Sequence, residues 1–355
     1  MEALTSVAIV GASGYTGAEL IRLLLGHPRV TIARVCARRA AGQTLAAVFP
    51  HLTGCLDAPI VGFDPDDVAA TCRVAFVALP HGEAAPVVAA LAARGVITLD
   101  LSADFRLRDA ATWAAWYGGG DHPTHPAPAL LAEAVYGLPE RHRADLRGAR
   151  LIAVPGCYPT ATTLAIAPLL AAGLVSPRGL LVDAKSGASG AGRTPGLATH
   201  LPEAAEGLRP YKVAGSHRHT PEIEQELGRA AGAAATVSFT PHLVPMARGI
   251  LANVYAQPTD PTAPAAAYRA ALQAAYADEP FVEVLPDGAL PDTAFVRGSN
   301  RCHVQVVYDA RVERVLAMSA IDNLVKGAAG QAVQCLNLAC GWPETTGLTM
   351  APMFP

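Results

Sequence analysis

The 355-residue sequence has little of several features that would mark a particular class of protein. Only three of its 27 basic residues are lysine, 6% of its residues are aromatic, and its formal net charge is −3. Because no tract of Lys or Arg is present, the sequence predicts no nucleic-acid partner. No apolar run reaches the ~18 residues of a membrane span, and the N-terminus lacks the basic segment of a signal peptide. We therefore expect a cytoplasmic protein with no membrane partner.

The patterns that usually hold a metal ion are also missing. The seven cysteines are odd in number and scattered, which favours reduced thiols over a disulfide framework. The sequence contains no CxxC and no HExxH. Cys335…Cys340 and His217-Arg218-His219 come closest, but neither pair has partners at the usual ligand spacing. The sequence therefore predicts no metal site.

The chain is long enough for two domains, and its first part alternates strands with helices. The expected strands are 6–10, 30–35, 74–79, 96–101 and 151–154, and the expected helices are 18–25 and 83–94. This alternation is typical of an α/β, doubly wound, Rossmann-like parallel sheet, whose ligands bind at the carboxyl ends of the strands. The turn-rich stretch 113–128 is predicted to be a flexible surface excursion with no functional histidine.

A glycine-rich loop follows the first expected strand and opens the first expected helix. Gly11 permits a tight turn, Gly14 lets the backbone approach a pyrophosphate, and Gly17 allows close helix–strand packing. The spacing is GxxGxxG, which differs from the commoner GxGxxG. No acidic residue lies at the end of the second strand, where an NAD site usually has one; Arg38 and Arg39 follow it instead. Two guanidinium groups suit a 2′-phosphate, so the sequence favours NADP(H).

Further candidate residues follow two later strands of the same predicted sheet. His81, in Leu79-Pro80-His81-Gly82, and Ser102 both stand directly after such strands. Arg106 follows shortly after Ser102 and is the stronger candidate to hold an anion. Because these ends meet at one edge of a parallel sheet, we expect them to lie near the cofactor.

Cys157 is the candidate nucleophile. A buried strand, 151–154, leads into Pro155-Gly156-Cys157, and an Ala-rich helix is expected over 160–170 with Pro159 at its first position. Cys157 then stands at a helix N-terminus, where the free N–H groups and the macrodipole lower the pKa of a thiol. A lone cysteine is more often a small buried hydrophobe, so this interpretation depends on the neighbouring motifs.

The histidine that would serve such a thiol lies in His217-Arg218-His219-Thr220-Pro221. Thr220 is a good N-cap with Pro221 at the first helical position. His219 then lies just before a helix, fixed yet exposed, as a general base or acid requires.

The second half of the chain has few long helices. The expected strands are 180–184, 235–239, 250–257, 281–285, 303–308 and 314–320, and a helix is expected over 264–277. This pattern predicts an α+β domain with a mixed or antiparallel sheet. Asp322-Asn323 is expected to cap a final helix, 324–338. The Gly-rich stretch 185–193 lets backbone approach a flat ligand.

Together the motifs resemble the N-acetyl-γ-glutamyl-phosphate reductases of arginine biosynthesis, which are relatives of aspartate-semialdehyde dehydrogenase. The matching stretches are 11–17, 79–82, 100–106, 155–160, 183–187, 217–222, 241–249, 297–301, 322–331 and 351–355. Val154, before Pro-Gly-Cys, departs from the Asn expected in many members.

The resemblance implies an NADPH-dependent reduction of an acyl phosphate to a semialdehyde, with Cys157 as the nucleophile and His219 as the base. It implies that Arg106, Arg248, Lys185, His217 and Ser102 bind substrate. The residues implied to bind NADP(H) are Gly11, Ser13, Gly14, Tyr15, Thr16, Gly17, Arg38, Arg39, Leu79, Pro80, His81, Ser186, Gly187, Gly190 and Asn323.

The resemblance also implies the division into domains and the assembly. Residues 1–154 with 324–355 form the NADP-binding domain, to which the last helix returns. Residues 155–323 form a catalytic domain whose sheet pairs subunits into a homodimer or homotetramer. Three alternatives stay open: a carrier-protein-linked aminoadipyl or glutamyl phosphate reductase of lysine biosynthesis, a non-catalytic NADP-binding regulator, and a direct dehydrogenase of a ketone or alcohol, which needs no thiol.

Overall fold

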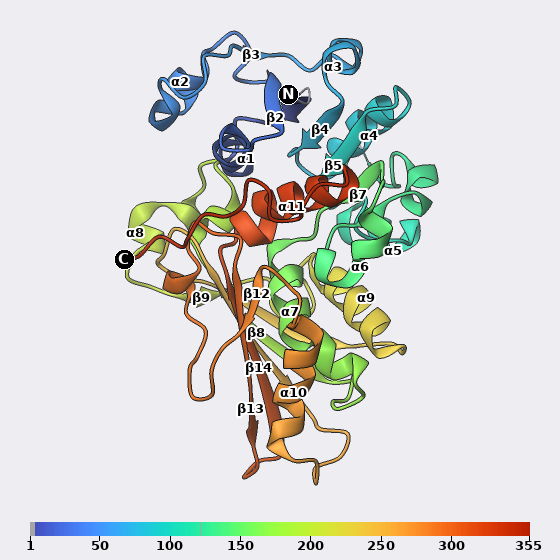
Figure 1. The fold of residues 1–355 in the computed structure, drawn as a ribbon, viewed down its shortest axis with the longest axis vertical. Helices are drawn as coiled ribbons and strands as arrows, with labels where there is room; N and C mark the ends of the chain where they lie inside the picture. Colours follow the sequence, from blue (N-terminus) through green and yellow to red (C-terminus); the bar gives the residue numbers. More distant parts are fainter. Residues whose placement is uncertain (1–3, 121) are drawn as a thin grey trace. The chain divides into compact units, whose positions relative to one another are not determined.

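A computed structural model describes residues 4–120 and 122–355 of the chain (Figure 1). The chain forms two compact units, one of residues 1–155 and 328–349 and the other of residues 156–327 and 350–355. Residues 1–3 and 121, which belong to the first predicted domain, lie outside the described residues.

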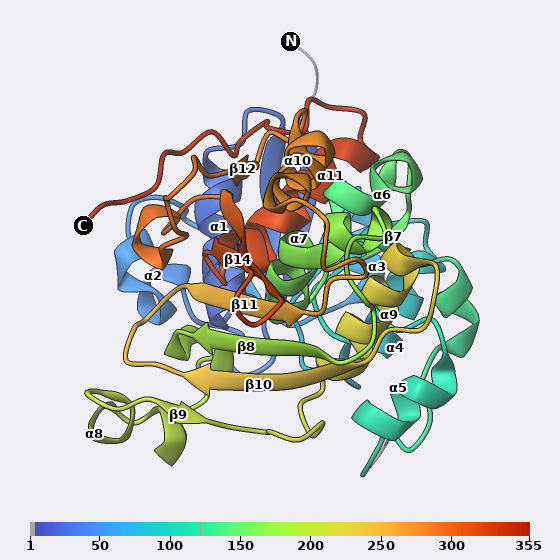
Figure 2. The ribbon, with the colours of Figure 1, turned by 90° about the horizontal axis from the view of Figure 1, so that it is seen from below.

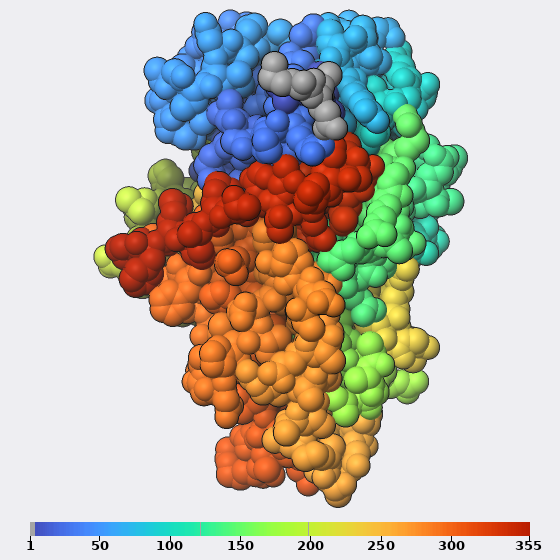
Figure 3. Space-filling model, viewed as in Figure 1, coloured from blue at the N-terminus to red at the C-terminus, as the bar shows by residue number. Residues whose placement is uncertain are grey.

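The C-terminal tail does not follow the predicted domain boundaries. Residues 350–355 group with the second unit, although 324–355 was assigned to the first domain. The reason is local, because Met353 N donates to Arg297 O at 2.8 Å and the Phe354 ring lies 5.6 Å from that of Phe295. In Figure 3 the red tail runs over the surface beside orange residues of this unit.

The first unit contains the predicted parallel sheet. Its strand order is β3-β2-β1-β4-β5-β7-β6, and every pairing is parallel. The strands are β1 (Thr5–Val10), β2 (Val30–Cys36), β3 (Ile60–Val61), β4 (Val74–Val77), β5 (Ile97–Asp100), β6 (Val135–Tyr136) and β7 (Leu151–Ala153). The order reverses between β1 and β4, so the loops that follow these two strands flank the switch point where such sheets bind ligands.

Helices cover both faces of this sheet. They are α1 (Tyr15–Leu25), α2 (Leu45–Val48), α3 (Pro65–Thr71), α4 (Ala84–Ala92), α5 (Ala110–Tyr117), α6 (Pro139–Leu146) and α11 (Gly330–Ala339). Ala8, Val10 and Val77 pack against Val68 of α3 and Val88 of α4. Since side chains alternate along a strand, the equally buried Val7, Ile9 and Phe76 face the other side, where α1 packs against α11 and α11 against α6.

The prediction of a flexible excursion at 113–128 is wrong for its first part, which is helical, whereas 118–120 and 122–127 are irregular and residue 121 lies outside the described residues. The Asp109 side chain accepts hydrogen bonds from the N–H groups of Ala111 and Thr112 and so starts α5. Trp113 in α5 is fully buried, and the buried His125 ring lies edge-on to it at 4.8 Å. This stretch therefore forms a small core of its own.

The second unit contains a seven-stranded mixed sheet of order β12-β13-β14-β11-β8-β10-β9. Its strands are β8 (Leu180–Ser186), β9 (Arg209–Pro210), β10 (Val237–Leu243), β11 (Ile250–Ala256), β12 (Val282–Val284), β13 (Cys302–Asp309) and β14 (Arg314–Ile321). The pairs β8–β10 and β12–β13 are parallel and the rest antiparallel. Figure 2 shows β11, β8 and β10 side by side.

Four helices belong to this unit, namely α7 (Cys157–Ala171), α8 (Leu201–Ala204), α9 (Thr220–Ala231) and α10 (Ala265–Tyr276). A π-helical turn, Val325–Ala329, precedes α11, and 3₁₀ turns occur at Pro50–Leu52, Pro128–Ala132, Ala188–Ala191, Leu197–Thr199 and Thr293–Phe295. The long buried helix α7 packs on β11, β13 and β14 and against α9 and α10.

Helix α7 continues through Pro168, which a helix interior normally excludes. Proline has no N–H to give to the carbonyl of Leu164, four residues earlier. The hydroxyl of Tyr276, at the end of α10, donates to that carbonyl oxygen at 2.6 Å instead. The tertiary contact thus satisfies the buried acceptor and lets α7 stay helical.

The sheet face away from α7 carries an apolar row. Leu181, Tyr255, Leu316 and Val307 are directly opposed on β8, β11, β14 and β13 and so lie on one face. Leu181 and Val307 are 50% and 46% exposed. An exposed apolar row in the middle of a sheet is typical of a surface that associates with another protein.

Candidate active site

Cys157 is the first residue of α7, two positions before Pro159, the predicted first helical residue. Gly156 before it is extended, with φ −67° and ψ 154°, and no side chain caps the helix. Gly156 N donates to Oε1 of Glu222 at 2.9 Å, and Thr160 Oγ donates to Gly156 O at 3.0 Å. The thiol is partly exposed. The predicted position of Cys157 at a helix N-terminus is therefore confirmed, and Pro159 lies inside the first turn.

The two histidines lie at the start of α9, which begins at Thr220. His219, rather than the predicted Thr220, occupies the N-cap position, and no side chain caps the helix. His217 Nδ1 accepts a hydrogen bond from His219 N at 3.0 Å, and the two rings lie 4.9 Å apart. The His219 ring also lies 5.9 Å from that of Tyr158, the residue after Cys157.

His217 is neutral at neutral pH. Burial, and to a smaller extent the charges of Lys212 and Arg218, lower its pKa to about 4. A neutral ring keeps a lone pair on Nδ1, as its hydrogen bond from the His219 backbone requires. His217 thus holds the backbone from which His219 projects.

Two tyrosine hydroxyls complete this cluster. Tyr158 and Tyr211 have their hydroxyl oxygens 3.1 Å apart. Burial, and to a smaller extent the charge of Cys157, raise the pKa of both phenols, that of Tyr211 to about 12. Both hydroxyls therefore stay protonated and can donate to a negatively charged oxygen or sulfur nearby.

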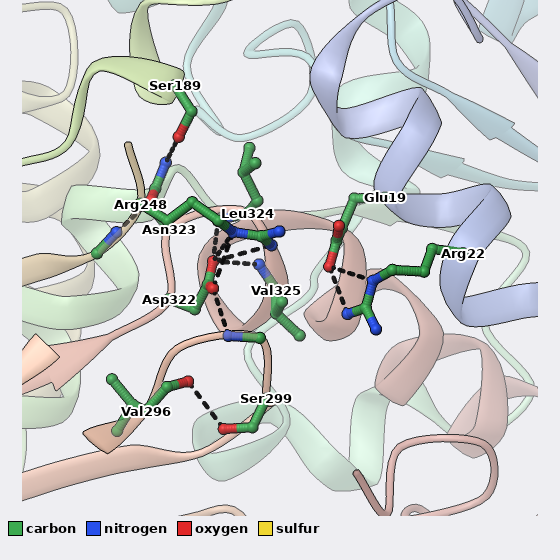
Figure 4. A network of polar contacts seen from close by, with 12 residues as sticks. Glu19, Arg22, Ser189, Arg248, Val296, Ser299, Asp322, Asn323, Leu324 and Val325 are labelled. Carbon is green, nitrogen blue, oxygen red and sulfur yellow. Dashed lines mark hydrogen bonds and ion pairs between the residues drawn. The ribbon is translucent and has the colours of Figure 1, made fainter. Parts of the chain in front are cut away.

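Arg248 lies beside a buried carboxylate in the same unit. Its Nε is 3.0 Å from Oδ2 of Asp322, which is fully buried (Figure 4). The neighbouring Asn323 accepts from Gly249 N at 2.7 Å and donates to Ser189 Oγ at 2.9 Å. Asp322, predicted to cap a helix over 324–338, accepts from Leu324 N at 2.9 Å through its Oδ1 ahead of a π-helical turn, whereas α11 begins only at Gly330 with no side-chain cap.

The remaining candidates of this unit lie on β8 or in the loop that follows it. Lys185 Nζ is paired with Asp183, whose other oxygen is 3.2 Å from Nδ1 of His242. Ser186 is buried and donates to Gly187 O at 3.0 Å. A Cβ on Gly190 would lie 3.2 Å from Ser186 Oγ, so these small residues pack closely. Lys185 is thus engaged with a carboxylate of the sheet.

Arg106 and Ser102, in the first unit, are largely occupied by the protein itself. Arg106 is buried, its Nε donates to Val154 O at 2.7 Å, and its Nη2 donates to Leu101 O at 2.8 Å. The Ser102 hydroxyl donates to Asp100 Oδ2 at 2.8 Å and accepts from Asp104 N at 3.0 Å. Arg106 therefore ties together the chain ends that follow β5 and β7.

The carboxylates of Asp100 and Asp104, on either side of Ser102, have separate roles. The Asp104 carboxylate is fully buried and accepts from Gly82 N at 2.8 Å and Ala85 N at 2.9 Å, which fixes the loop after β4. Burial, and next the charge of Asp104, raise the pKa of Asp100 to about 7. The His81 ring of this loop lies 5.3 Å from that of Tyr117.

The glycine loop has the geometry that a dinucleotide requires. Gly11 has φ +89°, and a Cβ there would lie 2.3 Å from Ala78 O. A Cβ on Gly17 would lie 2.5 Å from Ala12 O, so both glycines are needed for packing. A Cβ on Gly14 would meet only Gly11 O, at 3.8 Å, and no side chain caps α1 at Gly14. An uncapped helix start with an open backbone fits a pyrophosphate.

The predicted 2′-phosphate residues follow β2. Arg38 and Arg39 are exposed, and the Arg38 guanidinium lies 3.9 Å from Glu83, a distance at which exposed charges interact weakly. Both guanidinium groups are therefore able to meet a phosphate.

Two family models match the chain. Residues 6–149 match the semialdehyde dehydrogenase NAD-binding domain, and residues 157–323 match the semialdehyde dehydrogenase dimerisation domain. The chain is 51% identical over 352 residues to N-acetyl-γ-glutamyl-phosphate reductase of Citrifermentans bemidjiense, covering 99% of this chain and 100% of that one. The enzyme of the same name from Moorella thermoacetica is 48% identical with the same coverage.

The chain belongs to the N-acetyl-γ-glutamyl-phosphate reductase family. Solved structures of more distant proteins share the fold. Aspartate semialdehyde dehydrogenase II of Vibrio cholerae has a TM-score of 0.71 at 18% identity and covers 95% of this chain and 98% of its own. The Candida albicans aspartate semialdehyde dehydrogenase with NADP has a TM-score of 0.68 at 15% identity, with the same coverage.

Some residues of the site were not found from the sequence. No role was predicted for Glu222, which receives Gly156 N, or for Tyr158, Tyr211 and Asp104. Tyr158 could have been noticed because it follows the candidate nucleophile directly. The other three are recognised only through partners far away in the sequence.

Over residues 4–120 and 122–355, no three His, Cys, Asp or Glu side chains are grouped to hold a metal ion. Over those same ranges, no helix has both the length and the apolar character to span a membrane.

The low pKa of His217 predicts a pH-dependent stability. The unfolded histidine binds a proton near pH 6.5 and the folded one only near pH 4, so stability is full above 6.5 and falls as the pH drops to 4. In His217→Asn, whose amide oxygen can still accept from His219 N, we expect this loss to shrink by about 2 kcal/mol. Urea unfolding at pH 4.5 and pH 7 measures it.

His51→Asn is the matched control, because His51 is exposed. It should lose as much stability on acidification as the unmodified protein. An equal loss in the His217 variant and in the unmodified protein would contradict the assignment of a buried neutral ring.

Proposed function

We propose that the protein reduces N-acetyl-γ-glutamyl phosphate to N-acetylglutamate 5-semialdehyde with NADPH, releasing phosphate, in arginine biosynthesis. The observation that carries the proposal is Cys157 at the first position of α7, with Tyr158 packed on His219. Relatives about half identical along the whole chain bear the name of this activity. The free thiols of all seven cysteines agree with work in the reducing cytoplasm.

Cys157 attacks the acyl phosphate in the first step. Its Sγ forms a bond to the γ-carbonyl carbon, the bond from that carbon to the phosphate oxygen breaks, and phosphate leaves with the electron pair. His219 takes the thiol proton. The N–H groups at the start of α7 and the protonated Tyr211 hydroxyl stabilise the negative oxygen, at about 3 kcal/mol for each donor. The product of this step is a thioester on Cys157.

The second step reduces that thioester. Bound NADPH supplies the hydride that the carbonyl carbon accepts. Cys157 then departs as a thiolate when the resulting thiohemiacetal collapses to the aldehyde, and this departure restores the starting sulfur. A thiolate leaves readily because the helix N-terminus stabilises its charge.

Two groups of the cofactor residues are assigned to its phosphates. The backbone from Gly11 to Gly17, with Ser13, Tyr15 and Thr16, binds the pyrophosphate, and Arg38 with Arg39 binds the 2′-phosphate. The other assigned residues are Leu79, Pro80, His81, Ser186, Gly187, Gly190 and Asn323.

Arg248 is the better candidate to bind an anionic group of the substrate, because its unit also carries Cys157. Arg106 donates to two backbone carbonyls, so we assign it first to holding the chain before Cys157. Lys185 and Ser102 are engaged with Asp183 and Asp100, and we assign them to support of the site.

The reverse reaction tests the proposed function. With N-acetylglutamate semialdehyde, phosphate and NADP, we expect phosphate-dependent formation of NADPH, and NAD should support a much lower rate. Cys157→Ser should lower the rate at least about 10³-fold, because a serine hydroxyl is far less acidic than a thiol. The Cys55→Ser variant is the matched control, since Cys55 is an exposed cysteine outside the site.

Absorbance at the NADPH band measures the rate. A carrier-linked aminoadipate semialdehyde serves as the comparison substrate. A faster reaction with it, or full activity in Cys157→Ser, would overturn the proposal.

We further propose that two copies of the chain associate through the apolar row of the second unit's sheet, Leu181, Tyr255, Leu316 and Val307. A C2 dimer buries the same patch on both subunits, as this row allows. The matched family model is described as a dimerisation domain.

Leu181→Asp should therefore lower the molar mass in solution from that of a dimer towards that of a monomer. In a dimer, each Leu181→Asp subunit would bury a carboxylate that has no opposite charge, and this cost weakens the association. Light scattering during gel filtration measures the mass, and Leu4→Asp, at an exposed position in the first unit, should leave it unchanged. A Leu181→Asp protein of unaltered mass contradicts this interface.

A further inference from the structure

Asp322 is a charged group that neither the chemistry above nor the cofactor uses directly. Its carboxylate is fully buried at the end of β14. Oδ2 accepts from Gly298 N at 2.7 Å, and Oδ1 accepts from Leu324 N at 2.9 Å and Val325 N at 3.2 Å. A buried charge is costly unless it is paired and hydrogen-bonded, and here Arg248 supplies the opposite charge.

The backbone of Asp322 also builds the π-helical turn Val325–Ala329. Its carbonyl oxygen accepts from Val325 N at 3.2 Å and from Gly327 N at 3.0 Å. Turns of this kind are rare and occur frequently at functional sites. Lys326 in the turn is fully buried, with its ammonium 5.9 Å from the centre of the Phe281 ring. The Asp322 carbonyl before the turn and the buried Lys326 side chain within it therefore both hold the turn in place.

This turn lies directly against the nucleophile. A Cβ on Gly327 would lie 2.8 Å from Cys157 Cβ and 3.2 Å from Cys157 Cα. No side chain fits there unless Cys157 moves. The path of the turn thus fixes one side of the space in which the thiol can lie.

The next residue, Asn323, holds two further loops. It accepts from Gly249 N, beside Arg248, and donates to Ser189 Oγ. A Cβ on Gly187 would lie 2.8 Å from Arg248 N, so the two loops are packed backbone against backbone. Figure 4 shows Ser189, Arg248, Leu324 and Val325 arranged around Asp322 and Asn323.

We propose that Asp322 is a positioning residue that sets two parts of the site together: Arg248 through an ion pair, and Cys157 through the turn that brings Gly327 against it. Asn323 extends this control to the loop of Ser189. The inference rests on the proposed function for the meaning of Arg248 and Cys157, but the contacts themselves belong to one unit of the fold.

Three variants separate the two effects. Asp322→Asn keeps the shape but removes the charge opposite Arg248 and one acceptor oxygen. We expect kcat to fall about 100-fold, as for a misplacement of about 1 Å, and KM to rise about ten-fold. Gly327→Ala would press on Cys157, and more lightly on Ile321, but would leave the ion pair of Arg248 in place, so kcat should fall and KM should stay within about two-fold. Asn323→Ala should raise KM more than it lowers kcat.

A second measurement needs no substrate. The rate at which iodoacetamide modifies the Cys157 peptide, followed by mass spectrometry, should fall in Asp322→Asn and Gly327→Ala and stay unchanged in Asn323→Ala. Asp309→Asn, at an exposed carboxylate paired with Arg311, and Gly26→Ala, at the end of α1, are the matched controls and should change none of these values.

The outcomes are distinguishable. A wild-type protein that forms no NADPH overturns the proposed function, while the alkylation rates still test the positioning. Cooperative thermal unfolding checks that each variant is folded. If Asp322→Asn does not fold, the inference is tested by the difference between the other two variants. Gly327→Ala should mainly lower kcat, and Asn323→Ala should mainly raise KM. The inference would be overturned if the folded variants kept the kcat, the KM and the alkylation rate of the wild-type protein.

Discussion

The proposed mechanism depends on one constraint, namely that the N-terminus of α7 keeps a sulfur anion available. The helix favours negative charge at this end, and no side chain caps it. Glu222, fully buried, takes the N–H of Gly156 and so holds the turn that leads into the helix. In the proposed mechanism the charge of the thiolate is stabilised by the helix N-terminus and by the imidazole of His219.

The surrounding elements follow from this requirement. His217 must stay neutral to hold the His219 backbone, and burial ensures that it does. The carbonyl of Leu164, left without a helical donor by Pro168, is satisfied by Tyr276, so the helix that carries Cys157 remains rigid. Rigid support of a reacting group matters because a displacement of about 1 Å can lower the reaction rate about 100-fold.

Much of the fold could be predicted because its signals are local. The strand, glycine loop and helix at residues 5–25 are read from one short stretch, and the start of α7 follows from Pro155-Gly156. The Asp109 cap was an equally local signal, but the Gly, His and Pro residues that follow it hid α5. The position of His219 before a helix was predicted, although Thr220 does not act as its cap.

What could not be predicted depends on partners distant in the sequence. Glu222 and Gly156 are 66 residues apart, and Asp322 and Arg248 are 74 apart. No sequence periodicity or spacing indicates such a pairing, because an exposed carboxylate would give the same local sequence pattern as a buried and paired one. Lys185 and Asp183 are near neighbours on β8, but His242 reaches the same carboxylate only because its strand β10 lies beside β8.

The acyl group on sulfur is the central claim, and it can be trapped. The protein is mixed with N-acetyl-γ-glutamyl phosphate in the absence of NADPH, quenched in acid and digested, and its peptides are weighed. We predict that the Cys157 peptide gains the mass of one N-acetylglutamyl group and that hydroxylamine removes it. Turnover with NADPH but no adduct on Cys157, or an adduct only on another residue, would contradict the account.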